Sequence, residues 1–322
     1  MTSPRYRAVI TDCDYPDVEQ QRVVLEAAGA DLIWENLRTE EALIAGLAGA
    51  EVLLTQYAPL TARVIESLDS CRGIVRYGVG YDTVDLAAAS RRGIYVCNVP
   101  DYGTDEVSDH AVTMLLVLAR KIVPLAQSVQ AGAWSLEHIK PVGRLRGRTL
   151  GVIGLGRIGA LVAKKAQAFG IKVIACDPFL SADGFAALNV ESVELDDLLR
   201  QSDYVSRHAP LSPETRHLIS DRTLGLMKPS AFLINTARGG LVDGDALARA
   251  LRSGQIAGAA IDVTETEPIP RDSPLLGLDT CIVTPHAAWY SDEAASALQR
   301  LAAEEAVRLL RREPPRCPVN RL

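Results

Sequence analysis

Residues 149–159 read TLGVIGLGRIG, an apolar run that leads into the pattern Gly154-x-Gly156-x-x-Gly159. The residues before Gly154 have the composition of a buried strand, and those after Gly156 have that of a helix ending near Gly170. In such a strand–turn–helix unit the first glycine permits a tight turn, the second lets a pyrophosphate approach the backbone, and the third allows close helix–strand packing. The helix N-terminus then offers free N–H groups to the phosphates. The stretch therefore predicts a dinucleotide-binding site.

An acidic residue supports this prediction and distinguishes between cofactors. Asp177 follows the next predicted strand and lies 21 residues after Gly156. A carboxylate at this position accepts hydrogen bonds from ribose hydroxyls and repels the 2′-phosphate of NADP. The alternative, a surface aspartate that caps a strand, leaves this placement unexplained. We therefore expect NAD as the cofactor.

Short β-rich runs alternate with amphipathic runs along the whole chain. In the first series, strands are expected at residues 7–11, 31–35, 51–55, 73–76 and 94–98, and in the second at 149–153, 173–176, 204–206, 232–235, 259–262 and 282–284. Strict alternation predicts parallel sheets, because parallel strands need crossover connections. Two complete series predict an α/β fold with two doubly wound parallel-sheet domains.

The order of these elements predicts a discontinuous first domain. A helix-like stretch from about Asp105 to Gln130, broken late by Pro124, lies between the two series. The last helix, about Asp292–Arg312, is expected to cross back to the first domain. We expect a flavodoxin-like substrate domain at residues 1–100 and 289–322, with an NAD-binding Rossmann domain inserted at residues 101–288. The cleft between the domains is expected to hold the nicotinamide.

Composition excludes several classes of protein. The 322 residues are 48% hydrophobic and 23% charged, which is typical of a soluble globular protein. With a formal charge of −6 and no cluster of Lys and Arg, neither nucleic acid nor an acidic membrane surface is expected as a partner. Six scattered cysteines without a C-x-x-C pair predict no metal site and a cytoplasmic location. The N-terminal MTSPRYRAVITD predicts no signal peptide, and the longest apolar stretch is too short to span a bilayer.

Three polar residues are predicted near the carboxyl ends of strands in the second series. Arg238 lies in INTARGGLVD, Glu267 lies in the loop of AAIDVTETEP, and His286 lies in IVTPHAAWYS. Ligands of open α/β sheets bind at this edge. A guanidinium can bind a carboxylate bidentately, and a histidine held by a carboxylate can protonate a forming alkoxide. The alternatives are a surface salt bridge, a solvated loop acid and a capped strand end, but the three residues together, beside a dinucleotide fold, favour hydride-transfer chemistry.

Together these motifs resemble the D-isomer-specific 2-hydroxyacid dehydrogenases, over nearly the whole chain from Ile74 onward. The resemblance implies an NAD-dependent oxidoreductase that transfers a hydride between nicotinamide and a small D-2-hydroxy acid or 2-oxo acid. It assigns Arg238 to substrate binding and Glu267 with His286 to proton transfer. It further implies cofactor contacts at Thr104, Arg157, Ile158, His208, Pro210, Thr215, Thr236, Ala237 and Asp262, and substrate-carboxylate contacts at Val79 and Gly80.

The segment HAAWYS, Arg76 and NTARGGLVD are similar to the C-terminal binding protein branch of the family. That branch implies an alternative function, an NAD-sensing regulatory protein with weak or no turnover. Because the chain ends at Leu322 without a long disordered tail, we expect an enzyme. Glyoxylate/hydroxypyruvate and phosphoglycerate types of activity both stay open. A homodimer through the helix at 105–130 and the Trp134 segment is implied by the resemblance alone.

Three further residues carry open interpretations. Arg76 is expected near the substrate, where a second cation favours a substrate with a second polar or anionic group; the alternative is an ion pair with Asp82 or Asp85. Trp289 is expected to form an apolar wall beside His286, or else to pack the last helix. Arg207 occupies a position that is usually aliphatic in the family. We interpret it as a solvated arginine at the sheet edge, while a functional role would place it near the cofactor.

Overall fold

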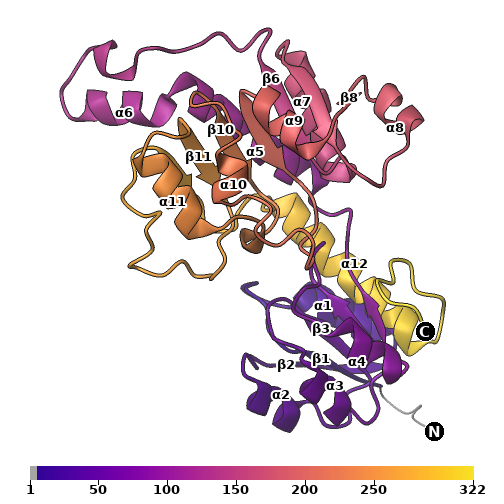
Figure 1. The fold of residues 1–322 in the computed structure, drawn as a ribbon. Helices are drawn as coiled ribbons and strands as arrows, with labels where there is room; N and C mark the ends of the chain where they lie inside the picture. The colour runs from indigo at the N-terminus through magenta and orange to yellow at the C-terminus, as the bar shows by residue number, and fades with distance from the viewer. Residues whose placement is uncertain (1–5) are drawn as a thin grey trace, which may run out of the picture. The chain divides into compact units, whose positions relative to one another are not determined.

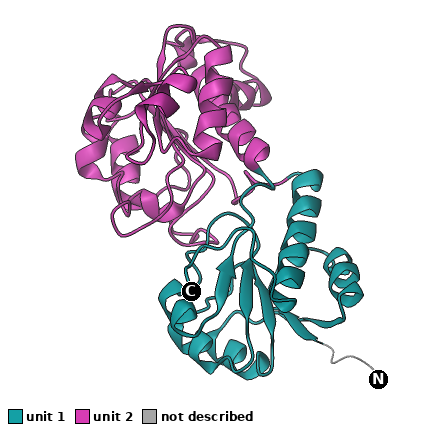
Figure 2. Cartoon of the chain, turned by 90° about the vertical axis from the view of Figure 1, so that its right-hand side faces the viewer, with its two compact units in different colours: residues 1–103, 291–322 teal, residues 104–290 magenta. Residues whose placement is uncertain are grey.

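The computed structural model describes residues 6–322 (Figure 1). The expectation of no signal peptide rests partly on residues 1–5, which lie outside the described residues. The chain divides into two compact units, the first comprising Met1–Gly103 and Ser291–Leu322 and the second Thr104–Tyr290 (Figure 2). Each unit has its own parallel sheet, so the predicted fold class of two parallel-sheet α/β domains is confirmed.

The first unit is built on a five-stranded sheet of order β2-β1-β3-β4-β5, in which all pairs are parallel. Its strands are β1 (Tyr6–Ile10), β2 (Ala30–Trp34), β3 (Val52–Thr55), β4 (Gly73–Arg76) and β5 (Tyr95–Cys97), and its helices are α1 (Glu19–Ala27), α2 (Glu40–Gly46), α3 (Ala62–Ser67), α4 (Leu86–Arg91) and α12 (Asp292–Leu310). The last helix, α12, packs against α1, β3 and β4. Since β3 and β4 are buried along their whole length, this sheet is covered on both faces, as a parallel sheet requires.

The second unit is built on a seven-stranded parallel sheet of order β12-β11-β10-β9-β6-β7-β8. Its strands are β6 (Thr149–Ile153), β7 (Lys172–Cys176), β8 (Glu191–Ser192), β9 (Tyr204–Arg207), β10 (Phe232–Asn235), β11 (Gly258–Ile261) and β12 (Cys281–Val283). Every strand expected from the sequence is present to within one residue at each end. The additional strand, β8, consists of two exposed polar residues and therefore carried no hydrophobic signal.

Helices cover both faces of the second sheet. The helices of the second unit are α5 (Thr104–Arg120), α6 (Ile122–Gln130), α7 (Arg157–Ala168), α8 (Ala182–Ala187), α9 (Leu195–Gln201), α10 (Asp221–Leu224) and α11 (Gly244–Arg252), with short 3-10 turns η1 (Glu137–Ile139) and η2 (Gly239–Leu241). Of these, α6 has no buried residue. Successive strand residues alternate between two cores, so that Ile234 packs with α5 and α7 while Leu233 packs with α9, α10 and α11. We call these the α5/α7 face and the α9–α11 face.

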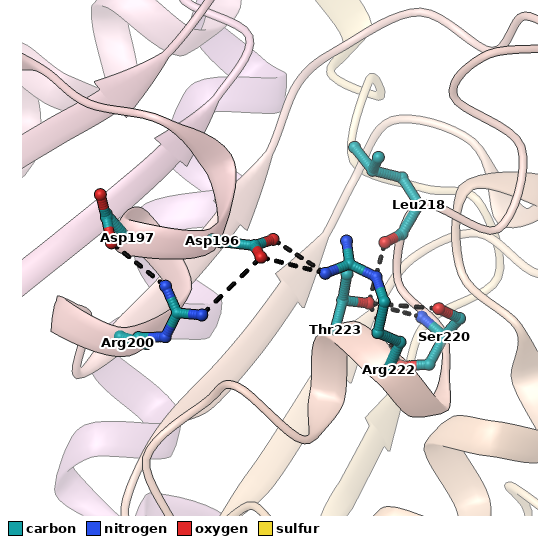
Figure 3. A network of polar contacts seen from close by, with 7 residues as sticks. All are labelled: Asp196, Asp197, Arg200, Leu218, Ser220, Arg222 and Thr223. Carbon is teal, nitrogen blue, oxygen red and sulfur yellow. Dashed lines mark hydrogen bonds and ion pairs between the residues drawn. The ribbon is translucent and has the colours of Figure 1, made fainter.

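Ion pairs join α9 to α10 on the outside of the α9–α11 face. Figure 3 shows Asp196 between Arg200 and Arg222, with the Arg222 guanidinium 3.0 Å from Asp196 Oδ1. In the turn before α10, the Thr223 hydroxyl donates to the Leu218 carbonyl at 2.9 Å. The ion pairs are solvent-exposed, and such pairs add little to stability. They do, however, engage Asp196, the acidic side chain of α9 that faces α10.

The long helix predicted at residues 105–130 does not break at Pro124. It breaks at Lys121, which has a left-handed φ of 51°, and α5 and α6 meet there at a bend of 60°. Pro124 lies instead in the first turn of α6, where a missing backbone N–H costs no intrahelical hydrogen bond. The predicted break at Pro124 is wrong because a proline in the first turn of a helix does not end that helix.

Residues 6–322 contain no single membrane-spanning helix and no cluster of metal-ligating side chains. Within them no single helix is long and apolar enough to cross a membrane, and only the bent pair α5–α6 passes by length and composition together. No group of three or more His, Cys, Asp or Glu side chains in this range is arranged to hold a metal ion.

The close approach of α12 to β4 predicts the effect of a small substitution. A Cβ added at Gly73 would lie 2.5 Å from Cδ1 of Leu309, so Gly73→Ala should lower the free energy of unfolding by about 1–3 kcal/mol through overpacking. The measurement is equilibrium unfolding in urea. In the Gly73→Ala/Leu309→Ala double variant the two losses should be less than additive, because the shortened side chain makes room. Strictly additive losses would show that α12 does not pack on β4.

Candidate functional site

Most of the predicted polar residues lie at one edge of the second sheet. The strands β6, β9, β10, β11 and β12 are parallel, so their carboxyl ends meet there. The sequences that follow β6, β10, β11 and β12 carry the glycine loop, Arg238, Glu267 and His286, respectively. The structure therefore brings the predicted cofactor and acid–base residues of the second unit to a common edge.

The glycine loop between β6 and α7 has the geometry of a phosphate cradle. Gly154 has a left-handed φ of 88°, and a Cβ there would lie 2.7 Å from the backbone nitrogen of Ala209. A Cβ at Gly159 would lie 2.1 Å from the Gly154 carbonyl oxygen, so this glycine lets α7 pack on the loop. Gly156 faces open space and is the N-cap of α7, whose first residues are Arg157 and Ile158. An anion can therefore approach the backbone beside the positive end of α7.

Asp177 connects the end of β7 to this loop. Its Oδ2 accepts a hydrogen bond from the backbone N–H of Leu155 at 2.7 Å, and its Oδ1 accepts from Phe179 N–H at 2.9 Å. Each carboxylate oxygen can accept a second hydrogen bond. The carboxylate therefore both holds the glycine loop in place and keeps acceptor capacity for ribose hydroxyls.

The loop after β9 is ordered by its own side chains. The Thr215 hydroxyl donates to the Pro210 carbonyl at 2.8 Å and accepts from the backbone N–H of Ser212 at 2.7 Å. Nε2 of His208 lies 2.8 Å from Oγ of Ser206. Burial of the imidazole, together with the nearby charge of Arg207, lowers the pKa of His208 to about 3. His208 is therefore neutral at physiological pH and adds no charge to this loop.

Asp262, directly after β11, organises the segment that carries His286. This carboxylate is 1% exposed and accepts hydrogen bonds from the Thr284 hydroxyl at 2.5 Å and from the backbone N–H groups of Ala287 and Ala288, each at 2.9 Å. The backbone N–H of His286 also donates to the Asp262 carbonyl at 2.8 Å. His286 has a left-handed φ of 54°, which is unusual for a non-glycine residue and is held by these bonds.

His286 and Glu267 form a hydrogen-bonded pair. Nδ1 of His286 lies 2.7 Å from Oε2 of Glu267, and Oε1 of Glu267 accepts from the backbone N–H of Thr264 at 2.9 Å. Burial raises the pKa of Glu267, but the hydrogen bond and charge of His286, the Thr264 N–H and the charge of Arg238 together lower that pKa below its ordinary value. Glu267 is therefore ionised at neutral pH. Because Nδ1 is bonded to Glu267, Nε2 is the ring nitrogen left to exchange a proton.

Arg238 is presented by the turn between β10 and η2. Nδ2 of Asn235 donates to the Arg238 carbonyl at 3.0 Å, and Oδ1 of Asn235 accepts from the Ala237 N–H at 3.2 Å. A Cβ at Gly239 would lie 2.0 Å from the Thr264 carbonyl, so this turn packs directly on the loop that carries Glu267. Thr236 is 8% exposed, and its hydroxyl has no hydrogen-bond partner among residues 6–322. A buried hydroxyl that lacks a hydrogen-bond partner in the described part of the chain indicates that a polar atom of a ligand binds to it.

The interpretation of Arg207 as a solvated arginine is wrong. Its side chain is 0% exposed, and Nη1 donates to the Leu241 carbonyl at 2.6 Å. Side chains alternate along β9, so Arg207 points to the same side as Val205, into the α9–α11 face. Burial lowers the pKa of Arg207 to about 9.

The expected substrate contacts of the first unit lie at the end of β4 and in the loop that follows it. Arg76 is 8% exposed, and its guanidinium lies beside Gly78, where an added Cβ would be 2.2 Å from Nη1. In the loop that follows, Val79 is exposed and Gly80 half-buried, and the Val79 carbonyl accepts from Asn98 Nδ2 at 2.7 Å. Of the two acids weighed as partners of Arg76, Asp85 caps α4 by accepting from the Ala88 N–H at 2.8 Å.

Trp289, His110 and His217 each contact another side chain of the second unit. The Trp289 ring is half-buried and packs edge-on against Tyr290, with 5.6 Å between ring centroids. On α5, Nε2 of His110 lies 3.3 Å from the Thr284 hydroxyl and 3.8 Å from Asp262 Oδ1. His217 pairs with Glu265 at 2.6 Å. These pairs join segments distant in sequence, so spacing along the chain gave no signal for them.

This edge fits a dinucleotide. The glycine cradle, the N-terminus of α7, the Asp177 carboxylate and the orphan Thr236 hydroxyl lie along the carboxyl ends of β6, β7 and β10. They offer N–H donors to phosphates, acceptors to ribose hydroxyls and a hydroxyl to a further polar group. The same edge presents His286, held by a carboxylate, and a guanidinium, as proton transfer and carboxylate binding require.

Comparisons with known proteins agree with this assignment. Residues 112–288 match the family described as "D-isomer specific 2-hydroxyacid dehydrogenase, NAD binding domain". A glyoxylate reductase of Korarchaeum cryptofilum is 42% identical over 81% of this chain and 80% of the relative. A D-3-phosphoglycerate dehydrogenase of Methanocaldococcus jannaschii is 39% identical over 98% of this chain, which covers 59% of the relative. The crystal structure of an Aquifex aeolicus D-lactate dehydrogenase with NAD and lactic acid has a TM-score of 0.87 and 30% identity, covering 95% of this chain and 96% of that one.

The dependence of the His286 segment on Asp262 gives a prediction about stability. Asp262→Asn should lower the free energy of unfolding by about 1–3 kcal/mol. The amide N–H group of asparagine would face the hydroxyl and backbone N–H donors whose hydrogen bonds the carboxylate accepts, and at least one of these donors would lose its acceptor. Thr284→Val, which removes one of the three donors, should cost less. Urea unfolding of both variants is the measurement. A loss for Asp262→Asn no larger than that for Thr284→Val would contradict the organising role of Asp262.

Proposed function

Because the chain belongs to the D-isomer specific 2-hydroxyacid dehydrogenase family, we propose that it reduces a small 2-oxo acid to the D-2-hydroxy acid with NADH, and catalyses the reverse oxidation with NAD. The observation that carries the proposal is the His286–Glu267 pair at the carboxyl edge of the dinucleotide-binding sheet. Proton transfer needs such a pair, whereas binding of a nucleotide alone does not. A regulatory NAD-binding protein therefore accounts less well for this edge.

When bound at this edge, NADH would supply the hydride for the substrate carbonyl carbon. His286 holds a proton on Nε2 and donates it to the carbonyl oxygen, so that one hydride and one proton are consumed for each hydroxy acid formed. Glu267, kept ionised by its lowered pKa, fixes the ring through Nδ1 and stabilises the imidazolium. In the oxidation the neutral imidazole removes the hydroxyl proton.

Arg238 binds the substrate carboxylate through its forked N–H donors and polarises the adjacent carbonyl. Asp262 supports the nicotinamide end indirectly, since two backbone N–H groups and a hydroxyl already use its oxygens. A hydrogen bond from the nicotinamide carboxamide would have to use a lone pair of the Asp262 oxygens that these three donors leave free. In the first unit we assign carboxylate contacts to the backbone of Val79 and Gly80, and contact with a second polar or anionic substrate group to Arg76.

The remaining cofactor contacts follow from the cradle. Backbone N–H groups of Arg157 and Ile158 would hold the pyrophosphate, Asp177 would hold the adenosine ribose, and Thr236 with Ala237 would line the nicotinamide. The ordered loop of His208, Pro210 and Thr215 would cover the adenosine, and Thr104, which begins α5, would make a further cofactor contact. Trp289 limits the bulk of the substrate side chain beside His286.

We assign a second copy of this chain as a partner, through α5, α6 and the segment after α6. That segment exposes large apolar side chains, with Trp134 89% and Leu136 60% exposed. Ile122 and Val129 of α6 are each 49% exposed. Apolar surface of this kind is typical of an interface between subunits.

The first prediction from the proposal concerns turnover. His286→Ala should reduce kcat for reduction of 2-oxo acids about 10²–10⁴-fold while leaving NADH affinity nearly unchanged, since proton transfer is lost and nucleotide contacts are kept. In Glu267→Gln the decline of the reduction rate at high pH should begin at lower pH, because the imidazolium loses its carboxylate. Steady-state rates between pH 5 and pH 9 measure both effects. A His286→Ala variant with most of its turnover would exclude this residue as the acid.

The second prediction concerns the nucleotide. Asp177→Ala should weaken NADH binding roughly tenfold to a hundredfold, since a charge-assisted hydrogen bond is lost, and it should relax discrimination against NADPH. Dissociation constants for both nucleotides are the measurement. Because Asp177 also holds the glycine loop, loop damage alone would weaken both nucleotides equally. An unchanged NADPH/NADH ratio, or a wild-type preference for NADPH, would contradict the role of Asp177.

A further inference from the structure

Arg207 is the largest fully buried side chain of the described residues, and its buried polar atoms are only partly satisfied. One guanidinium nitrogen, Nη1, donates to the Leu241 carbonyl at 2.6 Å. The other two nitrogens, Nε and Nη2, have no hydrogen-bond partner within residues 6–322. Because each buried donor without a partner loses its hydration, this arrangement is costly.

The charge of Arg207 has no acidic partner within 4.0 Å among residues 6–322. Acidic side chains of the covering helices are engaged at the surface, Asp196 with Arg222 and Asp221 with Arg249 at 2.7 Å. Burial lowers the pKa of Arg207 to about 9, so the guanidinium remains charged at neutral pH. Replacing a buried charge by an apolar side chain is often neutral or stabilising. Stability therefore does not explain an arginine here, and violations of local rules concentrate at functional positions.

The bond that Arg207 makes leads to Arg238. Leu241 ends η2, and Arg238 is the N-cap of that turn. The Leu241 N–H donates back to the Arg238 carbonyl at 3.3 Å, and the Leu241 carbonyl also accepts from Ile219 N–H at 3.1 Å. Since the other two residues of η2 are glycines, the turn is held by the buried Leu241 side chain and by the backbone hydrogen bonds of Arg238 and Leu241.

We propose that Arg207 is a positioning residue for Arg238: by holding the Leu241 carbonyl it fixes η2, and with it the direction in which the Arg238 guanidinium meets the substrate carboxylate. The proposal rests on the proposed function, in which Arg238 binds that carboxylate. In this role Arg207 acts through the Leu241 carbonyl of η2, to which its guanidinium donates, and not by contact with substrate or cofactor. Asn235, its partner in register on β10, holds the same turn from the Arg238 carbonyl.

The test is Arg207→Met, which keeps the length and removes the donors. We expect kcat/KM for a 2-oxo acid to fall about tenfold, mainly through KM, because a slightly misplaced binding group loses much of its effect. The dissociation constant for NADH should stay within about twofold, and the midpoint of thermal unfolding should be equal or higher. Arg207→Lys, whose ammonium can still donate to the Leu241 carbonyl, should recover part of the loss and serves as the second variant if Arg207→Met does not fold.

Two further variants distinguish a positioning role of Arg207 from a general effect of the substitution. In the Arg238→Ala background, Arg207→Met should have no additional effect on KM, because the group that it positions is absent. Arg216→Met is the matched control: its guanidinium also lies near Gly240, but it pairs with Glu265, and KM should not change.

Several results would overturn the proposal: an unchanged KM in Arg207→Met, full additivity with Arg238→Ala, or weakened NADH binding, which would make Arg207 a cofactor contact. Failure of the proposed function is a separate result. If Arg238→Ala itself leaves KM unchanged, the assignment of Arg238 to the substrate carboxylate is wrong. If Arg238→Ala raises KM and Arg207→Met does not, only the positioning role of Arg207 is lost.

Discussion

The buried carboxylate of Asp262 determines where the segment after β12 lies. Two backbone N–H groups and one hydroxyl converge on it, and the preceding His286 is held in a left-handed backbone conformation. Without these bonds a non-glycine residue would leave that conformation for a lower-energy one. The distance between His286 and Glu267 therefore depends on a carboxylate that belongs to neither side chain. Residues behind the acid–base pair fix its geometry, as a preorganised site requires.

Elsewhere along the edge of the second sheet, too, the segments assigned to ligand binding are held in place by neighbouring residues. Asp177 holds the glycine loop through the Leu155 N–H, Asn235 holds the turn of Arg238, and Gly239 lets that turn pack on Thr264. The three supports, a carboxylate, a side-chain amide and a glycine that permits close packing, all lie at or just after the carboxyl end of a parallel strand. Arg207 fits this pattern as a support for η2 that comes from beneath the turn.

The sequence predicted the parts of the fold that have a period or a motif. Buried strands, the glycine loop and Asp177 could be placed because their signals are local, and His286 and Glu267 because each follows a strand. The break at Lys121 was missed because a left-handed lysine has no signature in the sequence, whereas Pro124 does. The burial of Arg207 was missed because charge favoured the surface, although the alternation along β9 points its side chain inward. The contacts of His110 and the internal role of Asp262 join distant segments and needed the structure.

The most direct test of the account follows the product of the wild-type protein. A 2-oxo acid such as glyoxylate or pyruvate is mixed with NADH, and nucleotide oxidation, proton uptake and hydroxy acid formation are measured together. We expect one proton taken up and one hydroxy acid formed for each NADH oxidised, and only the D-isomer where the product is chiral. Binding of NADH without turnover of any 2-oxo acid, or formation of the L-isomer, would contradict it.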